Sequence, residues 1–291
     1  METGISPRTG AVLSTFLASL MFGTSYVAVK LAVGQTNPLL LGAGVMAVGS
    51  LMLVPVMLQR GTLTWSLFRR WEFWVGSLAN TWVVTTSYVG LTMTTASAAG
   101  LIIGTNVIFV ALLSRLLFEE RLGWKRGLGV LTAMLGLVTL TTRWDLTALE
   151  SARMTGNLLL LLSAAGIGVT VVLSRVALRR LEPDQWSFGM HMLLPLTLLA
   201  LTPLIPMEGG LEMSMLPAVL FIGAVCTTVP TVLWTGALRH ISVVTSATVL
   251  MVESAFAVLL SWLLLGERLD ALAGSGAALI LVAILILART D

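Results

Sequence analysis

The sequence predicts an all-α polytopic membrane protein with ten transmembrane helices, arranged as two inverted five-helix repeats. Three observations predict this fold: the composition, the length of the apolar segments, and a similarity between the two halves of the chain. Of the 291 residues, 57% are hydrophobic and 11% are charged, and the mean hydropathy is +0.96. Soluble proteins carry about 25% charged residues. The composition therefore excludes an ordinary soluble domain.

The apolar residues form ten long segments rather than short alternating runs. A helix that crosses a bilayer needs about 20 apolar residues. The predicted segments are 11–32, 38–58, 71–91, 95–118, 124–142, 155–178, 186–205, 215–238, 242–265 and 271–288. Polar or basic connections, or Pro and Gly, separate them, and the break at 92–97 is the weakest of these signals. No cleavage site follows the polar start "METGISPRTG", so we expect the first segment to be retained.

The Lys and Arg residues predict the orientation, because they concentrate in cytoplasmic loops. With the N-terminus in the cytoplasm, 13 of the 17 basic residues fall on the cytoplasmic side. The other four are Lys30, Arg143, Arg153 and Arg268. We therefore expect both termini in the cytoplasm and the protein in the cytoplasmic (inner) membrane. Because the basic residues lie in short loops, they indicate topology and no nucleic-acid partner.

An internal repeat joins the two halves. A shift of 147 residues aligns "FVALLSRLLFEERLGWKRGLG" (109–129) with "FAVLLSWLLLGERLDALAGSG" (256–276). Eleven of the 21 aligned positions are identical by count over those two stretches. The predicted repeats are 1–147 and 148–291, within one membrane domain. Because five is an odd number of crossings, the second copy enters from the opposite side, which is typical of secondary transporters.

The ends of the fourth and ninth segments, "LLSRLLFEERL" and "LLSWLLLGERL", resemble the drug/metabolite transporter (DMT) superfamily. Within it, the chain is similar to the ten-helix EamA type and to bacterial amino-acid exporters of the YddG type. The resemblance implies alternating access and export of small metabolites, often amino acids. In this family the ninth helix commonly has a Glu-Pro pair about fourteen residues before the "GE" turn. Here Glu253 is followed by Ser254, and Asn106-Val107 holds the equivalent place in the fourth segment.

Glu253 is the acidic residue near the middle of an apolar segment, where a carboxylate costs roughly 2.5–3.5 kcal/mol on insertion scales. It could bind a substrate amine, carry a proton, or donate a hydrogen bond to a neighbouring helix. The repeat pairs it with Asn106, so both halves place a polar group at the same depth. This pairing favours a Glu253 that faces a cavity over one that faces lipid.

The third segment, "WEFWVGSLANTWVVTTSYVGL", is unusually polar for a helix in contact with lipid. Asn80 and Tyr88 lie on one stripe with i, i+4, i+8 spacing, and Trp82 lies too deep for an interfacial belt. Aromatic, amide and hydroxyl groups suit a mostly apolar metabolite with a polar end. Hydrogen bonding between helices is the alternative role for these side chains.

His191 and Trp234 complete the candidate site. His191 lies one turn into the seventh segment, where it could line the pathway, shuttle protons or serve only in packing. Trp234 follows Pro230 in the eighth segment, and a proline there frees backbone carbonyls that are tolerated only against protein or a cavity. Lys30 is expected to be an interfacial anchor. The candidate substrate-binding residues are Asn80, Trp82, Tyr88, Asn106, His191, Trp234 and Glu253.

The function that the sequence favours is a secondary transporter that exports amino acids, possibly aromatic ones, or related metabolites by alternating access. The alternatives are a multidrug or other metabolite exporter of the same fold, a membrane-embedded enzyme acting on a lipid-linked substrate, and a non-transporting receptor or scaffold. No phosphate-binding loop or metal-ligand spacing is present in the sequence, so we expect no cofactor, no metal and no enzyme. A monomer or weak homodimer is expected, and proton coupling and facilitated diffusion both remain open.

Overall fold

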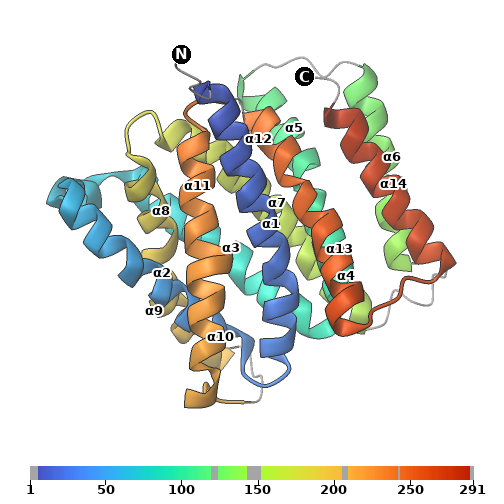
Figure 1. The fold of residues 1–291 in the computed structure, drawn as a ribbon, viewed down its shortest axis with the longest axis horizontal. Helices are drawn as coiled ribbons and strands as arrows, with labels where there is room; N and C mark the ends of the chain where they lie inside the picture. Colours follow the sequence, from blue (N-terminus) through green and yellow to red (C-terminus); the bar gives the residue numbers. More distant parts are fainter. Residues whose placement is uncertain (1–5, 119–123, 143–151, 205–208, 242, 289–291) are drawn as a thin grey trace, which may run out of the picture.

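The computed structural model describes residues 6–118, 124–142, 152–204, 209–241 and 243–288. Within them the chain folds into helices joined by short connections, with no strand (Figure 1). The first half contains α1 (Pro7–Val33), α2 (Pro38–Arg60), α3 (Trp71–Met93), α4 (Ala96–Gly104), α5 (Asn106–Phe118) and α6 (Trp124–Thr142). The second half contains α7 (Ala152–Ala177), α8 (Pro183–Met192), α9 (Leu194–Leu201), α10 (Leu216–Phe221), the π-helix η5 (Ile222–Thr228), α11 (Val229–Ala237), α12 (Val243–Leu250), α13 (Val252–Leu265) and α14 (Ala271–Ala288). Short 3₁₀ helices cover Trp65–Arg69, Thr202–Leu204 and Met213–Met215.

Seven stretches of the described residues are long and apolar enough to cross a membrane. They are Pro7–Val33, Pro38–Arg60, Ala96–Leu117, Arg153–Ala177, Pro183–Leu204, Met213–Ala237 and Thr245–Leu265. Two shorter apolar helices cover Gly127–Leu140 and Ala271–Ala283. The 23-residue helix α3 is as long as α2 but carries the polar side chains noted above. The multi-pass helical character is thus present in the structure, while the count of ten crossings stays a prediction.

The helix ends follow from local sequence. Asn37 precedes Pro38, and its Oδ1 accepts hydrogen bonds from the backbone N–H groups of Leu39 and Leu40, at 2.9 and 3.3 Å. An Asn at this position satisfies donors that the first turn of a helix leaves unpaired, and Pro is tolerated in that turn. Gly61 ends α2 with a φ of 66°. A left-handed conformation of this kind favours Gly because it has no Cβ.

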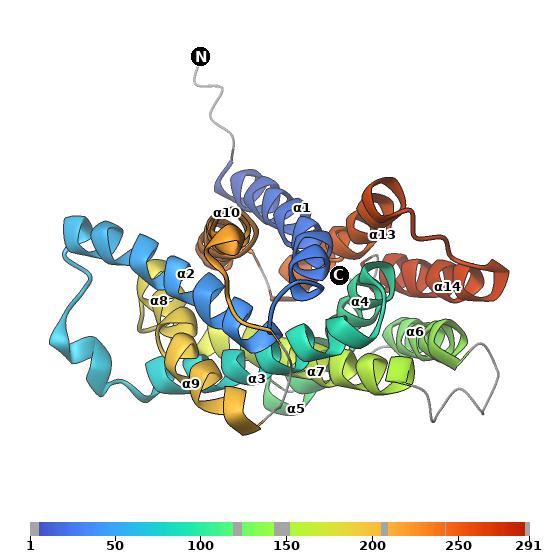
Figure 2. The same ribbon diagram turned by 90° about the horizontal axis from the view of Figure 1, so that it is seen from below.

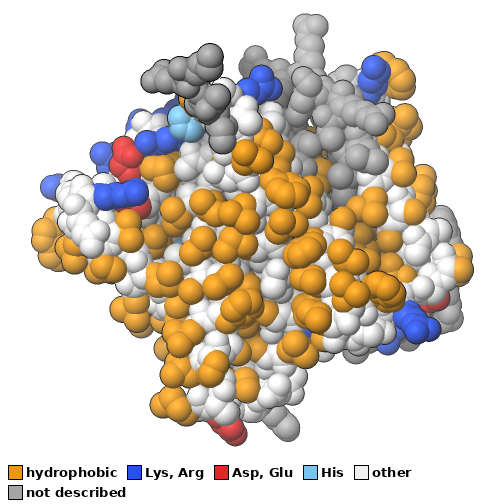
Figure 3. Space-filling view, viewed as in Figure 1, with side chains coloured by type: hydrophobic (Ala, Val, Ile, Leu, Met, Phe, Trp, Pro, Cys, Tyr) orange, Lys and Arg blue, Asp and Glu red, His pale blue; other side chains and the backbone are white. Residues whose placement is uncertain are grey.

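The bundle has one end at which α1 begins and α14 ends, at the top of Figure 1. We call this the N-terminal end and the other the distal end. Figure 3 shows hydrophobic side chains across the middle of one face, Lys and Arg mostly along its upper margin, and a smaller charged group at the lower right. This distribution agrees with an apolar belt between two polar margins.

The helices α6 and α14 pack against each other at the side of the bundle, as Figure 2 shows. A glycine from each helix lies at the crossing: a Cβ added to Gly136 would meet the backbone oxygen of Gly276 at 2.8 Å. Small residues let two helix backbones approach closely within a membrane. The two glycines therefore permit the close packing of α6 against α14.

This crossing leads to a stability prediction. Gly136→Ala is expected to destabilise the fold by about 1–3 kcal/mol, because the new methyl group overlaps the backbone of α14. The matched control is Gly274→Ala on α14, where nothing lies within 4 Å of an added Cβ. This control should be neutral or stabilising by up to about 1 kcal/mol from helix propensity. Thermal unfolding of both variants in detergent micelles measures the difference, and equal behaviour would contradict the packing argument.

Candidate functional site

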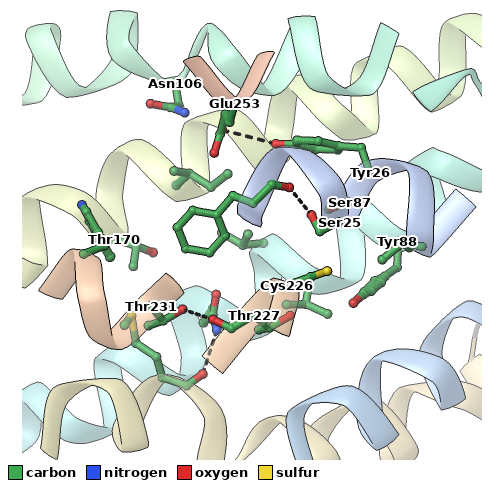
Figure 4. Close-up of a pocket in the computed structure, with 18 of the residues that line it drawn as sticks. Ser25, Tyr26, Ser87, Tyr88, Asn106, Thr170, Cys226, Thr227, Thr231 and Glu253 are labelled. Carbon is green, nitrogen blue, oxygen red and sulfur yellow. Dashed lines mark hydrogen bonds between the residues drawn. The ribbon is translucent and has the colours of Figure 1, made fainter. Parts of the chain in front are cut away.

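A cavity of about 200 Å³ lies between the two halves of the chain. Its volume is just below the range of about 300–1,000 Å³ that is typical of drug-sized ligands, which suits a small metabolite. The first half contributes residues of α1, α2, α3 and α5, and the second half contributes residues of α7, α8, η5, α11, α12 and α13. Figure 4 shows labelled side chains from both halves around it, including Tyr26, Tyr88, Asn106 and Glu253.

Two helices are interrupted at positions that the 147-residue shift of the internal repeat brings to within one residue of each other. Thr105 separates α4 from α5, and Met251 separates α12 from α13. At the first interruption the Thr105 hydroxyl donates to the carbonyl of Ile102 at 2.6 Å, and the backbone N–H of Thr105 donates to the same carbonyl at 3.0 Å. At the second, the N–H of Ser254 donates to the carbonyl of Met251 at 3.1 Å. Such i to i+3 bonds tighten a helix locally. The interruptions form although neither position is followed by proline.

Two further helices of the second half are interrupted beside the cavity. The π-helix η5 (Ile222–Thr228) ends two residues before Pro230, which cannot donate a backbone hydrogen bond. Leu193 separates α8 from α9, with Pro195 two residues further along. Cys226, Thr227 and His191 line the cavity beside these breaks. Irregular backbone at membrane depth is tolerated where it is buried in protein or lines a cavity.

Close helix crossings hold Glu253 in place. A Cβ added to Gly23 of α1 would lie 2.8 Å from the backbone oxygen of Glu253, and one added to Gly100 of α4 would lie 2.5 Å from the Cβ of Ala257. The Ser254 hydroxyl donates to the carbonyl of Gly100 at 2.8 Å. Glu253 is therefore fixed where α1, α4 and α13 meet, with only 7% of its surface exposed.

Tyr26 of α1 is the hydrogen-bond partner of Glu253. Its hydroxyl donates to Oε1 of Glu253 at 3.4 Å, a long hydrogen bond that leaves the second carboxylate oxygen for another donor (Figure 4). Glu253 and Asn106 both line the cavity, and each lies at the start of the helix that follows an interruption. The arrangement can bind a positively charged group and orient it between the two halves.

The structure brings six of the seven candidate residues to this cavity: Asn80, Tyr88, Asn106, His191, Trp234 and Glu253. The amide Nδ2 of Asn80 donates to the carbonyl of Met190 at 2.7 Å, which joins α3 to α8. The indole Nε1 of Trp234 donates to the hydroxyl of Ser246 at 2.8 Å. Helices from the expected third, fourth, seventh, eighth and ninth segments all contribute to the lining. That these side chains bind a substrate stays a prediction.

The seventh candidate, Trp82, is not among the cavity-lining residues. Its side chain is 53% exposed, and its Nε1 donates to the carbonyl of Leu162 on α7 at 3.2 Å. It packs beside Gly166, which leaves room for the indole ring. Trp82 lies at the same depth along α3 as the cavity, but its side chain points away from the cavity. In this structure Trp82 joins α3 to α7.

Several lining residues escaped the sequence argument. They include Phe22, Ser25 and Tyr26 from α1, Met46 from α2, and Thr170 from α7. Tyr26 could have been found because tyrosine is rare in this sequence: the chain has two tyrosines, and both lie deep within apolar segments. Buried Tyr hydroxyls usually have a hydrogen-bond partner. Lys30, for which the sequence predicted an interfacial anchor, donates from its Nζ to the carbonyls of Leu91 and Thr94, and the anchoring role stays a prediction.

Within the described residues, no group of three His, Cys, Asp or Glu side chains could hold a metal ion. Comparison with known proteins identifies the family. The profile of the EamA-like transporter family matches residues 9–142 and again residues 154–289. An uncharacterised transporter from Methanothermobacter thermautotrophicus is 28% identical over 199 residues, which cover 68% of this chain and 58% of that protein.

A solved crystal structure that shares 21% sequence identity superimposes with a TM-score of 0.71 over 97% of this chain and 98% of its own. At that identity, the likeness concerns the fold. The family match covers both halves of the chain, and the helices described above are those of a multi-pass membrane protein. The chain belongs to the EamA-like transporter family, within the drug/metabolite transporter superfamily.

Proposed function

We propose that this transporter exports amino acids, aromatic ones among them, or related small amine-bearing metabolites across the cytoplasmic membrane. The observation that carries the proposal is the cavity between the halves, where four helix interruptions and the Glu253 carboxylate meet. Interrupted helices at a repeat interface are the usual construction of a transporter site. The carboxylate supplies a partner for a substrate amine, and the apolar lining suits an apolar side chain.

The pattern of helix contacts supports two inverted repeats. The helix α1 packs against α11 and α13, and its repeat equivalent α7 packs against α3 and against α4 and α5. Two contacts join equivalent helices to each other, α6 with α14 and α2 with α8 and α9, and the contact of α4 with α13 corresponds to that of α12 with α5. An exchange of the two halves therefore maps each of these contacts onto another. In Figure 1, α1 runs downward from the N-terminal end and α7 runs upward, as inversion requires.

We infer that two charged side chains, each bound to a helix end, hold the distal end closed. The Nζ of Lys30 binds the carbonyls of Leu91 and Thr94, at the C-terminus of α3. The Glu267 carboxylate accepts from the N–H groups of Ala96 and Ser97, at 3.0 and 2.9 Å, at the N-terminus of α4. Each charge opposes the sign of the helix end that it meets, which is the stabilising arrangement. The repeat alignment pairs Glu267 with Glu120, which lies outside the described residues.

Polar contacts also join the halves at the N-terminal end. The Thr62 hydroxyl donates to Oδ2 of Asp184 at 2.8 Å, and Nε2 of Gln185 donates to the Thr62 carbonyl at 2.7 Å. Arg180 pairs with Glu72 at 3.2 Å. In the alternating-access mechanism that we propose, the contacts at the two ends would break in turn as the halves rock about the cavity. The monomeric or weakly dimeric state stays a prediction.

The transport proposal is tested by reconstitution of the full chain into liposomes. Labelled amino acids, including aromatic ones, are expected to exchange across the membrane faster than through empty vesicles. The same assay with and without an imposed pH gradient separates proton-coupled transport from facilitated diffusion. Exchange no faster than in empty vesicles, for every amino acid and for the corresponding amines, would remove this proposal.

Replacement of the cavity carboxylate provides a sharper test. Glu253→Gln keeps the shape of the side chain and removes its charge, so exchange of an amine-bearing substrate should fall by about 10- to 100-fold. Glu212→Gln is the control, because Glu212 lies exposed in the connection before α10. Equal exchange by wild-type protein and Glu253→Gln would take this residue out of the mechanism.

The distal closure can be followed at Cys226, the single cysteine of the chain, which is buried and lines the cavity. Glu267→Gln removes the charge at the start of α4, so a membrane-impermeant thiol reagent added on the distal side should label Cys226 about two- to tenfold faster. Glu212→Gln, at the same end but away from α4, should leave the rate unchanged. An unchanged rate in Glu267→Gln would show that this contact does not hold the distal end closed.

A further inference from the structure

We infer that the cavity selects a singly charged amine with an apolar body and a second N–H or O–H group, in preference to the amino acid with the same side chain. This inference rests on the proposed transport function and names the substrate class of the same cavity. It is argued from the charges and from the balance of hydrogen-bond donors and acceptors around the cavity. The proposed function does not depend on this balance.

The charges of the lining provide the first argument. Among the described lining residues, Glu253 is the one carboxylate, and none is Lys or Arg. Lys30 lies on a helix that lines the cavity, but its Nζ is bound to the carbonyls of Leu91 and Thr94. A buried charge is costly unless it is paired. The ammonium group of a ligand therefore has a charged partner here, whereas the carboxylate of an amino acid has none among these side chains.

His191 provides the second argument. Its Nδ1 lies 2.6 Å from the carbonyl oxygen of Ser187. Because a carbonyl oxygen only accepts, Nδ1 carries the hydrogen, and in the neutral ring Nε2 is left as an acceptor. The His191 side chain is 1% exposed and lines the cavity, and its Nε2 has no hydrogen-bond partner. A buried acceptor of this kind requires a donor, which a ligand N–H or O–H group would supply.

Other polar groups of the lining direct their hydrogens away from a ligand. The hydroxyls of Ser25, Thr170 and Thr231 donate to backbone carbonyls of their own helices, at 2.6, 3.0 and 2.7 Å. Asn80 donates to the Met190 carbonyl in the same way. These groups face the cavity mainly as acceptors. Neutral donors such as the Asn106 amide remain in the lining, but they do not neutralise a carboxylate.

The lining also contains a set of apolar side chains, among them Phe22, Met46, Val84 and Ile167. Such a surface accommodates a ring or an aliphatic chain between the charged and the uncharged hydrogen-bonding groups. An aromatic monoamine that also carries a ring N–H has all three features: an ammonium group, an apolar body and a second donor.

The test compares three ligands that share an indole body: tryptamine, 1-methyltryptamine and L-tryptophan. Binding to the purified full chain in detergent micelles is measured by titration calorimetry. Tryptamine is expected to bind at least about tenfold tighter than L-tryptophan, because the latter buries an unpaired carboxylate. Tryptamine is expected to bind about five- to tenfold tighter than 1-methyltryptamine, which lacks the ring donor.

Substitutions at His191 identify the acceptor. His191→Phe should make tryptamine and 1-methyltryptamine bind equally, whereas His191→Gln keeps an acceptor and should retain part of the difference. His240→Gln, at an exposed histidine after α11, is the matched control and should behave as wild type. Because the readout is a ratio between two ligands on one protein sample, a partial loss of folding in a variant does not mimic the result.

L-tryptophan binding as tightly as tryptamine would overturn the inference, as would a wild-type protein that does not distinguish tryptamine from its methylated form. Absence of binding by all three ligands would overturn it as well. Amino-acid exchange in liposomes could still occur in each of these cases, so the proposed transport function would survive. Conversely, the expected binding preference without any exchange in liposomes would leave the inference standing and remove the transport proposal.

Discussion

Every backbone N–H and C=O group that lies inside a bilayer has to find its partner within the protein, because no water is available there. This constraint governs the whole architecture. It makes the described chain helical along nearly its whole length, and it confines irregular backbone to places shielded from lipid. The interruptions at Thr105, Leu193 and Met251, and the π-helix before Pro230, all lie beside the same cavity. The cavity is therefore the place where the helices are allowed to be irregular.

Small residues make this concentration of polar groups possible. Gly23, Gly100 and Ser254 let three helices approach so closely that the backbone around Glu253 is shielded from lipid by protein. A carboxylate in contact with lipid would be costly, whereas one that faces a cavity can pair with a substrate or with Tyr26. Close packing therefore shields one side of Glu253 from lipid, and the cavity on the other side leaves its carboxylate free to pair. They explain why this acidic residue is compatible with an otherwise apolar segment.

The sequence was informative where the bilayer imposes length and composition. The apolar segments correspond to helices or pairs of helices, because a run of about 20 apolar residues leaves few alternatives. Polar residues within the apolar segments, such as Asn106 and His191, indicated the cavity because they are costly in contact with lipid. The direction of Trp82 was not predictable, since an indole ring is compatible with lipid, protein and ligand alike. The interruption at Met251 was also hidden, because packing and local hydrogen bonds produce it without proline.

The contacts that Lys30 and Glu267 make at the distal end differ from an ordinary ion pair in one respect. Lys30 and Glu267 bind the C-terminus of one helix and the N-terminus of the next, so each charge is matched to a backbone dipole of fixed direction. In an ordinary salt bridge, an exchange of the two charges preserves the attraction. Here the exchange would place an acid against carbonyl oxygens and a base against N–H groups. An exchange of Lys and Glu between these two positions would therefore not be tolerated. The direction of the helix dipoles determines which residue is basic and which is acidic.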